Sequence, residues 1–208
     1  MELLEIKEQL KHRMKYGVAH YSNDAWKRNA TATAKLYSQE ILMSIFMEEC
    51  CELIQQLSKH IRYQAIPDKE KQDDIRLCLH EEIADIQMAA APMCRCLTIN
   101  FGQIMETAEG IKQRAEAKPI HDMISESIKD ISIIMNLMAE YMYEVGIPKR
   151  VRETIKINLV TVIADIKILT KVLNLDEETM RCIGDMKFER HTAHLEKYYG
   201  YKPEQEES

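Results

Sequence analysis

The chain has 208 residues, of which 46% are hydrophobic and 30% charged, with a net charge of -6. This composition predicts an ordinary globular protein with one sizeable core or two small ones, and it excludes a disordered chain. The acidic balance disfavours binding to the phosphate backbone of a nucleic acid, which requires clustered Lys and Arg, although a bound metal can still bring a small polyphosphate into an acidic site.

The start of the chain, Met1-Glu2-Leu3-Leu4-Glu5, lacks the basic and apolar regions of a signal peptide. No run approaches the roughly 18 uncharged apolar residues that a membrane-spanning helix requires. We therefore expect a cytoplasmic protein that has no membrane partner.

Helical periodicity runs through nearly the whole chain, because only 6 Gly and 5 Pro interrupt it and strong helix formers dominate. Turn residues predict roughly seven helices in an all-α bundle, and Pro92 should kink or end the helix in which it falls. The predicted breaks lie at Gly17 and at 22–24, 65–68, 100–102, 118–119, 146–148 and 174–176.

The chain also shows an internal likeness at an offset of 80 to 81 residues. Residues 75–86 match 155–166, and Ala65-Ile66-Pro67 matches Gly146-Ile147-Pro148. These matches indicate two homologous halves, although any two amphipathic helical hairpins can align at this level. The predicted divisions are an N-terminal helical extension (1–34), a metal-binding half (35–118) and a degenerate half that packs on it (119–208).

The six cysteines show no metal-binding spacing. Cys50 and Cys51 are adjacent, Cys94 and Cys96 are separated by one residue, and the other two, Cys78 and Cys182, stand alone. None has the two-residue spacing of a zinc knuckle, so we interpret all six as reduced helix residues rather than redox or zinc ligands.

Two acidic clusters stand within apolar helical sequence, at 48–52 and at 81–85. In each cluster, carboxylates three residues apart project from one face of a helix. If the two helices pack together, the carboxylates converge, which is unfavourable unless a cation lies between them. Hard divalent cations prefer carboxylate oxygen, so the pattern predicts a magnesium site. The predicted ligands are Glu49, Glu52, Glu82 and Asp85.

A solvated acidic face is the alternative interpretation, because helical acids usually pair with Lys or Arg three or four positions away. These acids have no such neighbours, and apolar runs flank both clusters. The second half retains only two of the six acids at matching positions, Asp130 and Asp165, which is why we expect it to have lost the site.

The order Glu-Glu-x-x-Glu followed by Glu-x-x-Asp, in the segments 48–53 and 81–86, resembles the all-α nucleoside triphosphate pyrophosphatases, the superfamily of MazG and the dimeric dUTPases. The segment 187–190, Lys-Phe-Glu-Arg, also resembles the basic helix that follows the acidic helices in MazG proteins. The competing ferritin-like di-iron bundle requires Glu-x-x-His, which does not occur in this sequence.

The resemblance implies an enzyme that hydrolyses a nucleoside triphosphate between the α and β phosphates, with Mg²⁺, or Mn²⁺ as its substitute, on the four acids named above. Glu48 and Glu49 are the candidate catalytic residues, and Glu48 would complete a second metal site or orient the attacking water. The candidate contacts to the substrate are Lys112, Arg114, Lys187, Arg190 and Trp26, although basic residues at helix ends often only balance the helix dipole and aromatics are usually core.

Because members of this superfamily usually build the site from two subunits or two repeats, the resemblance implies a homodimer or an internal pseudo-dimer. Two alternatives stay open at this point. One is a non-catalytic nucleotide-binding or regulatory protein on the same helical scaffold, and the other is a structural bundle with incidental acids.

Overall fold

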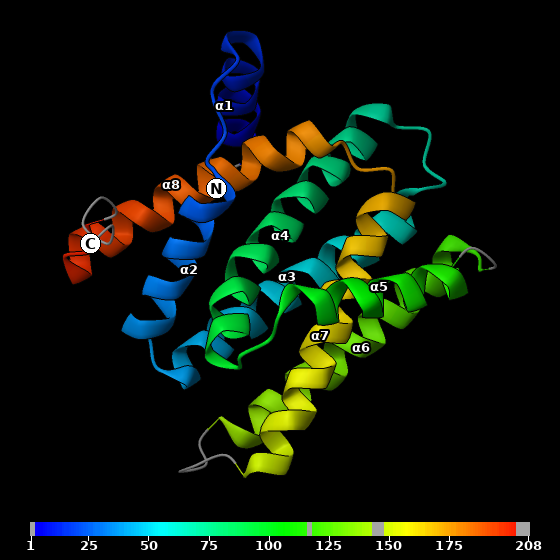
Figure 1. Cartoon of the computed structure of the whole chain (residues 1–208). Helices are drawn as coiled ribbons and strands as arrows, with labels where there is room; N and C mark the ends of the chain where they lie inside the picture. The colour runs from blue at the N-terminus through cyan, green and yellow to red at the C-terminus, as the bar shows by residue number, and fades with distance from the viewer. Residues whose placement is uncertain (1–2, 116–117, 143–147, 203–208) are drawn as a thin grey trace.

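The computed structural model of the chain describes residues 3–115, 118–142 and 148–202. Every regular element in these ranges is an α-helix, which confirms the predicted all-α fold (Figure 1). The helices are α1 (Leu3–Tyr16), α2 (Asn23–Leu36), α3 (Gln39–Tyr63), α4 (Lys69–Cys96), α5 (Phe101–Ala115), α6 (Ile120–Tyr141), α7 (Lys149–Val172) and α8 (Glu177–Tyr199).

The described part of the chain has one helix more than the roughly seven predicted, because α2 and α3 are separate helices. Tyr37 has extended backbone after α2, and Ser38 then begins α3 by accepting a hydrogen bond from the Ile41 backbone N–H with its hydroxyl oxygen. This break depends on a single capping residue in an otherwise helical run.

The expectation that Pro92 could end its helix is wrong, since α4 continues through it to Cys96. Pro92 has no backbone N–H and therefore cannot complete the helical ladder. Immediately beyond it, Met93 is fully buried and Leu97 is nearly so. The apolar burial of this last turn offsets the missing hydrogen bond.

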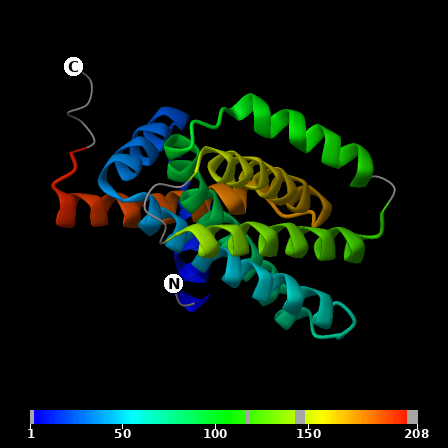
Figure 2. The same ribbon diagram turned by 90° about the horizontal axis from the view of Figure 1, so that it is seen from below.

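The main hydrophobic core lies between α3, α4, α6 and α7. The helices pair as α3 with α4, α6 with α7, α3 with α6 and α4 with α7, which makes a four-helix arrangement. Figure 2 shows α6 beside α3 and α7, with α5 covering α7 from outside. The core therefore contains helices of both predicted halves, while the relatedness of these halves stays a prediction.

The remaining helices lie over α4. α8 packs along α4, and α2 packs against both of them, while α1 stands out from the helical body beside α8 (Figure 1). Ile6 attaches α1 by packing with Ala84, Ile183 and Met186. This arrangement brings α2 and α8 next to the two helices that carry the acidic clusters. None of the described helices is long and apolar enough to cross a membrane.

We predict that Leu53→Ala lowers the free energy of unfolding by about 2–5 kcal/mol, because Leu53 is fully buried in the four-helix core. Gln55→Ala, which changes an exposed residue of the same helix, should cost less than about 0.5 kcal/mol. Urea unfolding followed by circular dichroism measures both. Equal losses in the two variants would contradict the assignment of the core.

Candidate functional site

The packing of α3 on α4 brings three of the four predicted metal ligands together. Carboxylate oxygens of Glu49, Glu82 and Asp85 all lie within 4.8 Å of one another. The fourth predicted ligand, Glu52, lies close enough that its charge, after burial, raises the pKa of Glu82. The three-residue spacings in the sequence therefore do place these side chains on the faces where α3 and α4 meet.

The solvated-face interpretation fails for α4, where Glu81 is 8% exposed and Glu82 is 7% exposed. It describes α3 better, since Glu48 and Glu52 are exposed and Glu49 is half-buried. The site is consequently an acidic cluster with a buried inner part on α4 and an open outer part on α3.

Lys187 of α8 supplies the positive charge that neither acidic helix carries. Its ammonium donates to Glu81 Oε1 at 2.8 Å and also to Asp85 Oδ2. Burial alone would lower the pKa of Lys187, but the charge and hydrogen bonds of Asp85 and Glu81 outweigh it and raise the pKa. Lys187, predicted as a phosphate contact, thus pairs with the acids in this structure.

One cation is too little for this group of acids. Burial, followed by the charges of Asp85 and Glu52, raises the pKa of Glu49 to about 7. Burial, followed by the charges of Glu52 and Asp85, raises the pKa of Glu82 to about 8. Both carboxyl groups are therefore harder to ionise near neutral pH than an exposed glutamate, unless further positive charge is added.

The inner part of the cluster fits a hard divalent cation. Glu82 Oε2 is buried and has no hydrogen-bond partner among the described residues. An unpaired buried carboxylate oxygen is costly, and it adjoins oxygens of Glu49 and Asp85. All three donors are carboxylates, which is the chemistry that Mg²⁺ selects.

The cluster forms one wall of a cavity of about 600 Å³ between α2, α3, α4 and α8. Glu48, Glu49, Glu52 and Asp85 lie on the acidic side, and Lys187 and Arg190 of α8 add two cations. Apolar side chains continue the wall away from the acids. These are Leu42, Ile45, Met88, Ala89 and Pro92.

An aromatic and hydrogen-bonding side completes the cavity where α2 meets α8. Thr33 contributes from α2, Tyr37 contributes from the position that follows α2, and His191 contributes from α8. His191 Nε2 lies 2.9 Å from the Thr33 hydroxyl, and the Tyr37 ring stands edge-on to the His191 ring. Burial lowers the pKa of His191 to about 4, so this ring is neutral near pH 7.

Two of the other predicted substrate contacts, Lys112 and Trp26, do not line the cavity. Lys112 lies exposed on α5, which packs on α7. The side chain of Arg114 lies outside the described part of the structure. Trp26 packs against Phe188 at a ring separation of 5.0 Å and also lies against Gly184, where a methyl group would be 3.6 Å from its ring. Trp26 therefore joins α2 to α8 and does not line the cavity.

Local sequence spacing missed some residues of the site. In the sequence, Glu81 is only one more like charge. No spacing pattern marks His191 or Thr33, because the two residues meet only when α2 packs against α8. The basic segment at 187–190 was the one sequence feature that pointed to α8.

The second half carries a smaller counterpart. Asp130 and Asp165, the two acids that match the first half, line one cavity of about 40 Å³ together with Glu126 and Lys118. Lys118 pairs with Glu126 at 2.5 Å. That this cavity is related to the carboxylate site through a duplication stays a prediction.

Comparisons with protein-family models, curated proteins and solved structures found no match for this chain.

The raised pKa values predict how stability depends on pH. Between about pH 5 and pH 8, the folded protein holds protons on Glu49 and Glu82 that the unfolded chain has released, so metal-free stability should fall as pH rises. Because Mg²⁺ favours the charged form, its stabilising effect should grow over the same range. Thermal unfolding with and without Mg²⁺ at several pH values measures this, and an Mg²⁺ effect independent of pH would contradict it.

We further predict that Glu82→Gln stabilises the metal-free protein at pH 8 by about 1–3 kcal/mol, because it removes a buried charge while keeping the shape of the side chain. The same change should abolish the stabilisation by Mg²⁺. Glu70→Gln, an exposed change near the start of α4, serves as the control in the same melts. Loss of stability in Glu82→Gln without metal would indicate that the carboxylate is itself a favourable partner in the fold.

Proposed function

We propose that this protein is a magnesium-dependent nucleotide pyrophosphohydrolase that cleaves a ribo- or deoxyribonucleoside triphosphate to the monophosphate and pyrophosphate. The observation that carries the proposal is the convergence of Glu82 with Glu49 and Asp85. Glu49 and Asp85 line a cavity that also contains Lys187 and Arg190. The acidic motifs that resemble the MazG and dimeric dUTPase superfamily give the reaction its class.

The two chemical sides of the cavity suit the two parts of a nucleotide. A triphosphate is a strong anion, and it can lie against acids only through metal and cations. The carboxylates with Lys187 and Arg190 provide that side, while Tyr37, Thr33 and His191 provide aromatic surface and hydrogen bonds suited to a nucleoside. The volume of about 600 Å³ lies within the usual range of ligand sites.

Each residue then has a defined task. The ligands of Mg²⁺ would be Glu49, Glu82 and Asp85. Glu52, near Glu82, would be available as a further ligand. The bound metal supplies neutralisation of the phosphate oxygens and a lowered pKa for a coordinated water. Glu48 and Glu52, exposed on the cavity wall, are placed to accept a proton from water or to orient it. Lys187 and Arg190 would hold the phosphates in line.

Lys187 must change partners in this scheme. With Asp85 engaged as a metal ligand, the attraction that holds the Lys187 ammonium to Asp85 would weaken, and the ammonium would be available to a phosphate oxygen. The same ion pair favours the second candidate function, a non-catalytic nucleotide-binding or regulatory protein, since Lys187 already balances part of the acidic charge without metal.

The deciding experiment assays a panel of ribo- and deoxyribonucleoside triphosphates with Mg²⁺, measuring pyrophosphate and orthophosphate separately. We expect pyrophosphate with the matching monophosphate. Glu49→Gln and Asp85→Asn should each reduce kcat/KM by about 100-fold or more, because both remove charge from the metal site. Exposed acids on the same helices provide matched controls, Glu40→Gln on α3 and Glu70→Gln on α4, which should retain activity.

Release of orthophosphate would place the cleavage elsewhere and overturn the reaction. Full activity in Asp85→Asn would overturn the site. Binding of nucleotide, measured by calorimetry, without turnover across the whole panel would favour the non-catalytic candidate.

A further inference from the structure

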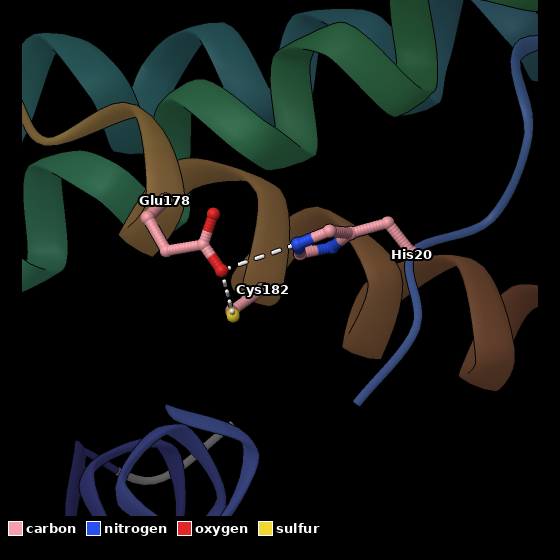
Figure 3. A group of neighbouring side chains, drawn as sticks. All are labelled: His20, Glu178 and Cys182. Atoms are coloured by element: carbon pink, nitrogen blue, oxygen red, sulfur yellow. Dashed lines mark hydrogen bonds and ion pairs between the residues drawn. The ribbon is translucent and has the colours of Figure 1, made fainter. Parts of the chain in front are cut away.

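A second group of metal-ligating side chains lies at the start of α8, apart from the carboxylate cavity. His20 comes from the segment between α1 and α2, while Glu178 and Cys182 are one turn apart on α8. Figure 3 shows one Glu178 oxygen between the His20 ring and the Cys182 sulfur. One ligand atom from each residue lies within 4.8 Å of the others.

Two of the three separations are close to those of a tetrahedral metal site. His20 Nε2 lies 3.2 Å from Glu178 Oε1, and Cys182 Sγ lies 3.9 Å from the same oxygen. Zinc bonds of about 2.0–2.3 Å place neighbouring tetrahedral ligands roughly 3.3–3.7 Å apart. A position about 2.4 Å or less from all three atoms therefore exists, so a metal would require only small side-chain shifts.

The second nitrogen of His20 is already fixed by a buried carboxylate. His20 Nδ1 lies 2.6 Å from Asp185 Oδ2, and the Asp185 side chain is only 3% exposed. The other Asp185 oxygen accepts the Tyr21 backbone N–H at 3.3 Å. A carboxylate behind a histidine is the usual support of a metal ligand, because it holds the proton on Nδ1 and directs the lone pair of Nε2 outward.

With that proton on Nδ1, His20 Nε2 and the Glu178 oxygen are two acceptors that face each other. A cation between them would satisfy both acceptors. The Cys182 thiol donates to the same Glu178 oxygen, so its sulfur stands beside both acceptors, and as a thiolate it would add affinity for a borderline-soft metal.

We propose that His20 Nε2, Glu178 and Cys182 Sγ form a zinc-binding site, with Asp185 as the positioning residue and a water molecule as the fourth ligand. A nitrogen, sulfur and oxygen donor set suits Zn²⁺ and not Mg²⁺, so the site is chemically distinct from the carboxylate cluster. On binding, the S–Zn bond forms and the thiol proton leaves to solvent. This assigns a role to Cys182 that its isolated position in the sequence did not suggest.

The effect of the metal follows from what it would join. His20 belongs to the connection that precedes α2, and α2 already packs against α8. Zinc would add a second attachment by holding this connection to the start of α8. The ion would therefore stabilise the placement of α8, the helix that carries Lys187 and Arg190 to the cavity. Its role is structural and does not require that the cavity be catalytic.

The test titrates Zn²⁺ into the full chain under thiol-reducing conditions with excess Mg²⁺, so that the carboxylates are occupied. We expect one equivalent bound, and a rise of the unfolding midpoint by about 5–10 °C at zinc concentrations 100-fold above Kd. Co²⁺ in place of Zn²⁺ should give visible bands of tetrahedral strength and a thiolate charge-transfer band in the near ultraviolet.

Variants then locate the metal. Cys182→Ser and His20→Gln should each weaken zinc binding by about 100-fold or more, and Asp185→Asn by about 10–100-fold. Nearby residues of the same type give matched controls, Glu177→Gln on the first turn of α8 and Cys78→Ser on α4, and both should bind zinc like the original chain. Circular dichroism without metal shows that each variant is folded.

Three results would overturn the proposal. These are no zinc binding by the original chain, binding that Cys182→Ser leaves unchanged, and binding that is lost only when Glu49 or Asp85 is changed. The first would leave His20 as an ion-pair partner of Glu178 and Asp185. Nucleotide hydrolysis is not used as a readout, so its absence would not affect the outcome.

Discussion

The packing of α3 on α4 forces like charges into a partly dry space, and much of the surrounding structure compensates for this. Each helix is amphipathic on its own, with its acids beside the apolar face that enters the four-helix core. Burying the core therefore brings Glu49, Glu82 and Asp85 together whether or not a cation is present. The hydrophobic energy of the core outweighs the electrostatic cost, so the site is held ready by the fold.

Compensation comes from a helix distant in sequence. Lys187 reaches Glu81 and Asp85 from α8, and this ion pair is part of what fixes α8 along α4. Breaking one side of a buried pair leaves an uncompensated charge, so the acids and Lys187 form one coupled set. The change of partner by Lys187 that the proposed function requires would loosen α8, which is why other attachments of α8 matter.

Sequence reasoning succeeded where local geometry decides. Three-residue spacing on a helix fixes the shared face, so Glu49 shares a face with Glu52, and Glu82 shares one with Asp85. The convergence of the two pairs also requires that α3 pack on α4. Sequence reasoning failed where tertiary packing decides. The approach of Lys187 to Glu81 and Asp85, and the packing of Trp26 of α2 against Phe188 of α8, depend on which helices become neighbours. The missed break at Ser38 shows a third limit, since one hydroxyl separates two helices within a continuous helical pattern.

Along α8, three features follow one another in order. Glu178 and Cys182 begin the helix, Lys187 lies about 13 Å beyond Glu178, and Arg190 with His191 occupies the next turn. The separation makes the proposed zinc group and the carboxylate cavity independent in chemistry, with no shared ligand. Both sites include residues of α8, so fixing the start of α8 also limits how far the middle of α8 can move. A zinc-held start of α8 would leave Lys187 free to change partners while the helix itself keeps its place on α4.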